Sequence, residues 1–138
     1  MPARDRYHDW VKATLMQAGW TISHDPLSLS IGKISVQIDL GLENLIGAEK
    51  GTEKIAVEIK SFGNASQITD FYAAFGQYLC YKVALAERER DRNLYLAVPA
   101  PVYNVFFGEI LIQKVLQAYP VNLLVYELSI QEIQLWID

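Results

Sequence analysis

The chain has 138 residues, 51% of them hydrophobic and 20% charged, and its formal net charge is −4. This length and hydrophobic content predict a single domain over residues 1–138 with a core of its own. The single cysteine, Cys80, excludes an internal disulfide, and we expect it to be a buried, reduced thiol inside a helix. No apolar run approaches the about 20 residues that span a bilayer, and the amino terminus lacks an apolar signal segment, so we expect a cytoplasmic protein without membrane contact.

The first part of the chain predicts one helix and two short strands. The helix covers residues 4–18 and ends at Gly19, because one face repeats apolar residues at helical spacing. That apolar face consists of Tyr7, Val11, Leu15 and Ala18. Short strands are expected over residues 20–23 and 27–31, separated by a turn at an Asp-Pro pair.

The next two predicted strands carry three ionisable side chains on their polar faces. In residues 34–39 every second residue is aliphatic, so Asp39 projects from the opposite face. In residues 55–60 the aliphatic residues again fill one face, while Glu58 and Lys60 project together from the other. If these two strands are neighbours, Asp39 and Glu58 face each other with the Lys60 ammonium beside them.

The remaining segments complete an α/β pattern. Residues 42–49 fit a short helix or an irregular connection, and Ser66 is expected to cap a long helix over residues 66–87 that packs on the sheet. The buried face of this long helix is predicted to comprise Ile68, Phe71, Tyr72, Phe75, Leu79 and Val83. Further strands are expected over residues 94–98, 121–126 and 132–137, with a mostly helical segment over residues 102–118. This order predicts an α/β sandwich with helices around a mixed sheet.

The three ionisable side chains suggest a metal site. Two carboxylates, Asp39 and Glu58, can hold a hard divalent cation such as Mg²⁺ or Mn²⁺ and leave positions for water and a phosphate oxygen. Lys60 would then polarise the attacking water or offset the charge that grows on the phosphate. The plainer alternative is an exposed carboxylate–ammonium pair, worth about 0–1 kcal/mol. Spacing alone does not decide between the two.

A set of short motifs, spread from the first residue to the strand at 94–98, carries a family resemblance. The motifs are Met1-Pro2-Ala3-Arg4-Asp5, His24-Asp25-Pro26, Asp39-Leu40-Gly41, Ala48-Glu49-Lys50-Gly51, Ile55 through Phe62, Gly76-Gln77-Tyr78 and Leu94 through Pro99. With them the chain closely resembles the XisH family over nearly its whole length. These proteins are fdxN element excision controlling factors of cyanobacteria, grouped with the PD-(D/E)XK, restriction-endonuclease-like fold. The resemblance therefore implies a three-layer α/β/α sandwich around a mixed central sheet, a role in DNA excision and a protein partner, XisI.

Several other residues are candidates for the same site. Resemblance to nuclease-fold proteins, which often place a glutamine on the helix after the acidic strand, implies that Gln77 orients water or phosphate; a surface amide is the alternative. Asp9 is considered because some relatives of this fold use an acid of the first helix as a ligand, whereas His8 is expected on the helix surface. Glu43 and Glu49 could reach the metal from a loop, with solvated charge as the alternative.

Net charge bears on the choice between functions. An excess of four acidic charges predicts weak, salt-sensitive DNA binding by the chain alone, so a partner such as XisI would supply recognition or basic surface. The aromatic residues are numerous enough to leave a surface for that partner or for a second copy of the chain. Three interpretations remain: a Mg²⁺- or Mn²⁺-dependent DNA endonuclease with Asp39, Glu58, Lys60 and Gln77 as catalytic residues, an accessory factor that directs a separate recombinase, and a purely structural remnant of such a site.

Overall fold

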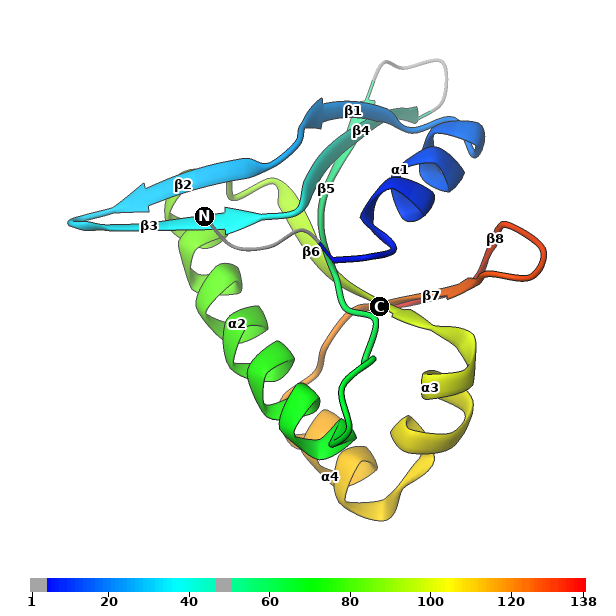
Figure 1. Ribbon diagram of the computed structural model, residues 1–138. Helices are drawn as coiled ribbons and strands as arrows, with labels where there is room; N and C mark the ends of the chain where they lie inside the picture. The colour runs from blue at the N-terminus through cyan, green and yellow to red at the C-terminus, as the bar shows by residue number, and fades with distance from the viewer. Residues whose placement is uncertain (1–4, 47–50) are drawn as a thin grey trace.

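The computed structural model describes residues 5–46 and 51–138 (Figure 1). Within these residues the elements are α1 (His8–Gln17), β1 (Thr21–His24), β2 (Leu27–Ile31), β3 (Ile34–Ile38), β4 (Leu40–Ile46), β5 (Gly51–Ile59), α2 (Gln67–Arg88), β6 (Arg92–Pro99), α3 (Ala100–Val105), the 3-10 helix η1 (Phe106–Gly108), α4 (Ile110–Ala118), β7 (Leu123–Glu127) and β8 (Glu132–Ile137). None of the helices in the described parts of the chain is long and apolar enough to cross a membrane.

Six strands form the main sheet, in the order β1-β4-β5-β6-β7-β8. The central strands β5, β6 and β7 are parallel, and the pairs toward both edges are antiparallel. β2 and β3 form a separate antiparallel hairpin that extends away from the main sheet (Figure 1). The predicted α/β organisation with a mixed sheet is therefore confirmed.

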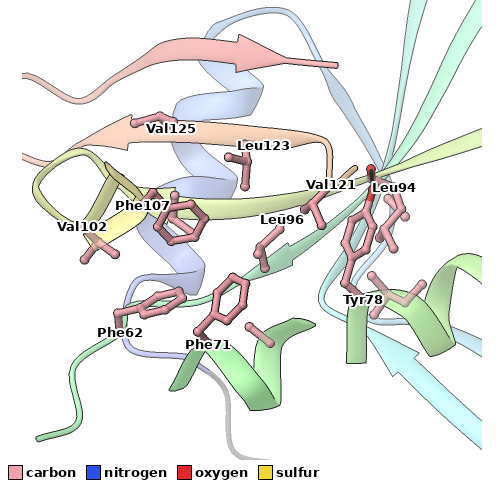
Figure 2. Packing of buried hydrophobic residues seen from close by; sticks show 14 of the residues in the cluster. Phe62, Phe71, Tyr78, Leu94, Leu96, Val102, Phe107, Val121, Leu123 and Val125 are labelled. Atoms are coloured by element: carbon pink, nitrogen blue, oxygen red, sulfur yellow. Dashed lines mark hydrogen bonds between the residues drawn. The ribbon is translucent and has the colours of Figure 1, made fainter. Parts of the chain in front are cut away.

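The two faces of the sheet pack against different helices. Successive residues of β6 alternate between two apolar cores: Leu96 belongs to the core shared with α2, α3 and α4, shown in Figure 2, and Ala97 to the core shared with α1. α1 contributes Val11 and Leu15 to the second core, both fully buried. Because β6 is buried on both faces, residues 94–98 form a nearly continuous apolar run in the sequence.

The helix α1 confirms the first predicted helix in part. It begins at His8 and ends at Gln17, and residues 1–4 lie outside the described residues. Gly19 adopts a φ of 102°, a left-handed conformation that costs glycine little, and the chain turns there into β1. The predicted stop at Gly19 is therefore confirmed.

The long helix α2 has the predicted cap but a different buried face. The Ser66 hydroxyl accepts a hydrogen bond from the Thr69 N–H at 3.3 Å. Of the predicted buried residues, Phe71 is buried and Ile68 and Phe75 pack against the core. The other three are exposed: Tyr72 (64%), Leu79 (37%) and Val83 (65%).

Tyr78 explains this rotation of α2. Its side chain is buried, and its hydroxyl donates to the Leu94 carbonyl at 3.2 Å and accepts from the Asn122 N–H at 3.0 Å. The small side chains of Ala74 and Ala84 are also buried on this face, so the helix can approach the sheet closely. Apolar counting favoured the wrong face because the hydroxyl of Tyr78 is satisfied inside the core. The same rotation leaves Cys80 exposed, so the predicted buried thiol is wrong.

The segment between the two acidic strands is a strand rather than a short helix or an irregular connection. β4 pairs antiparallel with β5, from Leu40 opposite Val57 to Ile46 opposite Gly51. Leu40 and Leu42 are both fully buried, so alternating inward side chains hold β4 in the sheet. Residues 47–49 of the predicted segment lie outside the described residues.

The predicted helix over residues 102–118 is divided. α3 ends at Val105, the 3-10 helix η1 follows, and Glu109 has the extended backbone (φ −63°, ψ 145°) that separates η1 from α4. Phe107 of η1 is fully buried and contacts Phe62 and Phe71 edge to face. The break between α3 and α4 thus allows the Phe107 ring to enter the core.

Candidate functional site

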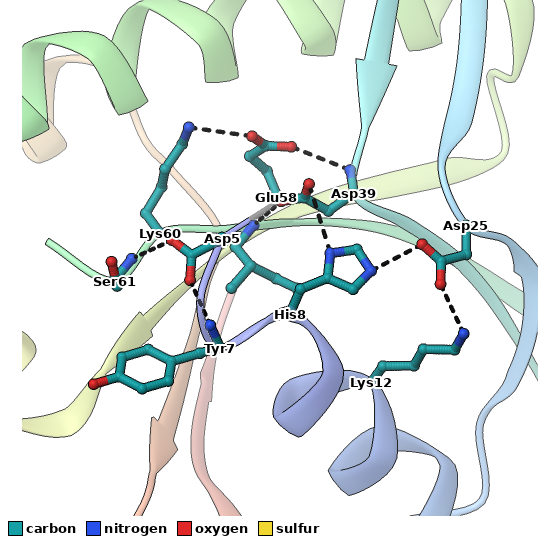
Figure 3. A network of polar contacts seen from close by, with 10 residues as sticks. Asp5, Tyr7, His8, Lys12, Asp25, Asp39, Glu58, Lys60 and Ser61 are labelled. Atoms are coloured by element: carbon teal, nitrogen blue, oxygen red, sulfur yellow. Dashed lines mark hydrogen bonds and ion pairs between the residues drawn. The ribbon is translucent and has the colours of Figure 1, made fainter. Parts of the chain in front are cut away.

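Asp39 lies at the bend where the chain leaves the hairpin β2–β3 and enters the main sheet. Its predicted strand is therefore not the neighbour of β5; β3 pairs with β2, and β4 takes the place beside β5. Asp39 nevertheless reaches Glu58: its N–H donates to Glu58 Oε1 at 3.2 Å, and its Oδ2 accepts from the Ile59 N–H at 2.7 Å (Figure 3). The two acids are brought together by a bend rather than by a strand pair.

Glu58 and Lys60 lie at the carboxyl end of β5. Ile55, Val57 and Ile59 pack in the core with α1, so Glu58 projects toward the opposite face, as the alternation predicted. Glu58 is 6% exposed, and its Oε2 lies 3.3 Å from Lys60 Nζ. The Lys60 N–H donates to the Ala97 carbonyl at 2.9 Å, which continues the parallel pairing one residue beyond β5.

The surroundings of Asp39 and Glu58 disfavour the ionised form of both acids. Burial, together with the negative charge of Asp39, raises the pKa of Glu58 to about 8, although Lys60 opposes this shift. Burial also raises the pKa of Asp39, despite the hydrogen bond from the Ile59 N–H. Lys60 alone therefore does not compensate the buried Glu58 and the half-buried Asp39, and the raised pKa favours the protonated form of Glu58 at neutral pH when nothing else supplies positive charge.

His8 connects Asp39 to a second acid. It is 2% exposed, so the expectation of a surface histidine is wrong. Its Nε2 lies 2.8 Å from Asp25 Oδ1 and its Nδ1 lies 3.8 Å from Asp39 Oδ1. The buried Nδ1 has no hydrogen-bond partner among the described residues. Lys12, one helical turn after His8, binds the other oxygen of Asp25 at 2.7 Å. Burial raises the pKa of Asp25, but the hydrogen bonds from Lys12 and His8 outweigh it and lower that pKa.

The acid that ties the start of α1 to the site is Asp5 rather than Asp9. Asp5 Oδ2 accepts from the Ser61 N–H and Oδ1 from the Tyr7 N–H, both at 2.9 Å. Its negative charge contributes to the raised pKa of Asp39. The side chain of Asp9 is exposed. Sequence spacing did not identify Asp5 because its partner Ser61 is distant in the chain.

On α2 the residue close to the acids is Tyr81. It is half-buried, and burial together with the charges of Glu58 and Asp39 raises its pKa to about 12. Gln77 lies one turn earlier on the same helix and is exposed. The effect of both charges on Tyr81 shows that this side of α2 lies near the acids.

The two remaining acidic candidates have different outcomes. Glu43 lies on β4, where its Oε2 is 3.7 Å from a guanidinium nitrogen of Arg92, so it forms an ion pair at the opposite end of β5. Glu49 lies outside the described residues. Neither adds a ligand to Asp39 and Glu58 in the described part of the chain.

A small cavity is lined in part by Lys60. It has a volume of about 220 Å³, and its lining includes Asp5, Lys60, Ser61 and Asn64. Asn64 is held by Asp70 of α2 through its side-chain amide at 2.8 Å. This cavity is large enough for a tetrahedral anion beside Lys60, although Asp5 and Asp70 would oppose one that is not accompanied by a cation.

The donor set can be tested against a divalent cation. No three His, Cys, Asp or Glu side chains of the described residues converge as metal ligands. Asp39 and Glu58 can each accept further bonds beyond the backbone hydrogen bonds described above. Both have raised pKa values, and a nearby cation would lower them by stabilising the ionised forms. The residues therefore fit an ion held by two carboxylates and completed by water or phosphate oxygens, the arrangement that Mg²⁺ accepts.

Comparison with known proteins identifies the family. The sequence profile described as XisH protein matches residues 1–134, and the chain belongs to the XisH family. A crystal structure of an XisH family protein from Nostoc punctiforme is 37% identical, with a TM-score of 0.87 over 97% of this chain and 100% of that one. A crystal structure of an fdxN element excision controlling factor protein from Anabaena variabilis is also 37% identical, with a TM-score of 0.86 over 98% of this chain and 100% of that one. A comparison with curated protein sequences finds no match.

Proposed function

We propose that this protein controls the excision of a DNA element, of the fdxN type, through a nuclease-like metal site that acts on DNA. The observation that carries the proposal is the buried Glu58 side chain, which accepts a hydrogen bond from the Asp39 N–H and lies 3.3 Å from Lys60 Nζ. The name of the Anabaena relative supports the excision role. Helices on both faces of a mixed sheet support a restriction-endonuclease-like, PD-(D/E)XK arrangement.

The location of the acids favours a ligand site over a structural one. They lie at the carboxyl end of β5, and the carboxyl ends of parallel strands are where open α/β sheets bind ligands. A bound Mg²⁺ or Mn²⁺ would supply a Lewis acid and a more acidic water. Asp39 and Glu58 would hold it, and Lys60 would neutralise charge on a phosphate in the adjoining cavity. Gln77 and Tyr81 would orient groups on the α2 side.

His8 would act as a positioning residue in this proposal. Its contact with Asp25 fixes the imidazole, and its Nδ1 side lies toward Asp39. The ring therefore limits how far the Asp39 carboxylate can turn away from Glu58. We assign it no direct contact with substrate.

A partner is part of the proposal. The chain carries four more acidic than basic side chains, so its own attraction to DNA is weak. An XisI-type excision factor would supply recognition or basic surface, and action on chromosomal DNA would take place in the cytoplasm of a cyanobacterial cell.

The second candidate function is an accessory factor without hydrolysis, which binds DNA or a protein partner and directs a separate recombinase. The specific observation in its favour is that two carboxylates, rather than three or more convergent ligands, form the site in the described residues. The two functions share the family role and differ in whether DNA is cut.

Nicking of supercoiled and branched DNA distinguishes the two functions. The purified chain would be assayed in Mg²⁺ or Mn²⁺, with and without XisI, alongside Asp39→Asn and Lys60→Ala. The endonuclease proposal requires metal-dependent nicking that both variants lose while remaining folded. Glu43→Gln is the matched control, because this acid lies at the other end of β5, and it should cut normally.

Two results would contradict the endonuclease proposal. Undiminished nicking by Asp39→Asn would show that another site, or a contaminant, cuts the DNA. Absence of nicking under every condition, with folded protein and measurable binding to XisI, would leave the accessory function. Isothermal titration with Mn²⁺ then separates an accessory factor that keeps its metal site from a purely structural remnant.

A further inference from the structure

A second concave site lies on the other face of the sheet. It is a groove of about 860 Å³ at the end of α1, where the ten-residue helix no longer covers the sheet. Its floor is formed by β5, β6 and β8, and its lining includes Glu53, Tyr95 and Trp136. Glu53 precedes Ile55 by two residues and so faces the α1 side of β5, whereas Glu58 faces the α2 side. The groove is therefore separate from the site of Asp39 and Glu58.

Aromatic rings from three segments that are distant in the chain meet in this groove. The rings of Trp20 and Trp136 are stacked, with centroids 5.9 Å apart and planes at 29°. The ring of Tyr95 meets Trp136 edge to face, at 5.1 Å and 86°. Trp136 remains 37% exposed whereas Trp20 is 9% exposed, so this cluster is open to solvent mainly at Trp136. Aromatic faces attract cations, and tryptophan does so most strongly.

The charged side chains of the groove are all acidic. Glu53, Glu132 and Asp138 contribute carboxylates, and none of the twelve described residues that line the groove is lysine, arginine or histidine. The Tyr95 hydroxyl donates a hydrogen bond to the Asp138 carboxylate. Burial, this hydrogen bond and the charges of Asp138 and Glu53 all raise the pKa of Tyr95. Negative charge thus accumulates beside aromatic rings without an opposing cation among the lining residues.

We propose that this groove binds an organic cation, an alkylguanidinium or alkylammonium group, against the rings of Trp20 and Trp136 and between the carboxylates of Glu53 and Asp138. The aromatic faces would contact the apolar stem and the delocalised charge, and the carboxylates would accept its N–H groups. A hard metal ion is a poorer match, because most of this surface is ring and alkyl carbon rather than oxygen. The cation could belong to a basic side chain of a protein or to a free polyamine.

Titration with small probes tests the proposal on the intact protein. N-acetylarginine amide, N-acetylcitrulline amide and spermidine would be added while the indole N–H signals are followed by NMR. Citrulline has the shape of arginine but no charge, so it controls for stacking alone. We expect saturable shifts of the Trp20 and Trp136 signals with the two cations, and at least a tenfold weaker response to citrulline. Trp10, which packs on Tyr126 outside the groove, is the internal reference.

Variants make the test specific to the groove. Glu53→Gln is nearly isosteric and should weaken cation binding about tenfold, whereas Glu87→Gln, at an exposed acid of α2, should leave it unchanged. A tighter response to arginine amide identifies a protein side chain as the source, and a tighter response to spermidine identifies a polyamine; either supports the proposal. Equal responses to arginine and citrulline, or unchanged affinity in folded Glu53→Gln, would overturn it. DNA nicking plays no part in the readout, so failure here leaves the proposed function untouched.

Discussion

Two ionic clusters, each centred on a buried charged residue, lie at opposite ends of the β5–β6 pair. Only in one of them does every buried charged group have enough partners of opposite charge or hydrogen-bonding groups. At the amino end, Arg92 is 5% exposed and donates hydrogen bonds to the Leu42 carbonyl at 3.2 Å, the Ile55 carbonyl at 2.9 Å and the Glu89 carboxylate at 2.8 Å. At the carboxyl end, Glu58 shares one nearby ammonium with Asp39. In the first cluster the arginine supplies hydrogen bonds to backbone carbonyls of the sheet. In the second cluster a further positive group would stabilise the two acids.

The largest expected effect is on the Arg92 cluster. Arg92→Met removes the donor and leaves two carbonyls and the Glu89 carboxylate without it, so unfolding free energy should fall by about 3–5 kcal/mol. Urea denaturation measures this loss. Arg90→Met, at an exposed position next to the same turn, should change stability by less than about 0.5 kcal/mol. Similar losses in the two variants would mean that the Arg92 cluster is not what stabilises this end of the sheet.

The second effect is a pH dependence that comes from Glu58. Its pKa is about 8 in the folded chain against an ordinary 4.5, so the folded state binds more protons than the unfolded state between these values. Stability therefore falls as pH rises through this window, by roughly 2–4 kcal/mol between pH 5 and 8. Glu58→Gln should flatten the curve and Glu87→Gln should not. A wild-type curve that rises over this window would contradict the raised pKa.

The third effect is the stabilisation expected when a divalent cation supplies positive charge to Asp39 and Glu58. Mn²⁺ at about a hundred times its dissociation constant should stabilise the folded chain by about 2.7 kcal/mol at pH 8, because the ion binds only where the acids are assembled. Thermal unfolding with and without the ion measures it. Asp39→Asn should abolish the stabilisation, and Glu43→Gln should retain it. Equal stabilisation of wild type and Asp39→Asn would locate the ion elsewhere.

The smallest effect is expected for Glu43, the most exposed member of the Arg92 cluster. The side chain of Glu43 is 37% exposed and lies 3.7 Å from Arg92, which also has closer partners. Glu43→Gln should therefore cost about 0–1 kcal/mol in urea denaturation. A loss comparable to that of Arg92→Met would show that the guanidinium depends on this acid more than the distances indicate.

The alternation of apolar and polar residues along strands and the cap of α2 were predicted correctly from the sequence. The α/β order, the two-sided burial of β6 and the shared face of Glu58 and Lys60 all follow from local patterns. The rotation of α2 does not, because it depends on a hydroxyl of Tyr78 that finds partners on β6 and beside β7. Such partners are invisible to a count of apolar residues.

The candidate site shows the same division. The proximity of Asp39, Glu58 and Lys60 was predicted from their spacing, although the geometry that joins Asp39 to Glu58 is a bend and not the expected strand pair. His8 and Asp5 were missed, because their importance comes from contacts 17 and 56 residues away in the chain. The i, i+4 spacing of His8 and Lys12, with one acid of a turn to bind both, is the signal that could have indicated a buried role.

A carboxylate lies at each of the two roots of the hairpin β2–β3, Asp25 before β2 and Asp39 after β3. Between these roots the hairpin packs on α2, where Arg88 Nε donates to the Ser30 carbonyl at 3.1 Å. His8 lies between these two roots and contacts both acids. Because Asp39 Oδ2 also accepts a hydrogen bond from the Ile59 N–H, a change of backbone conformation at the end of β3 would move an oxygen that lies beside Glu58.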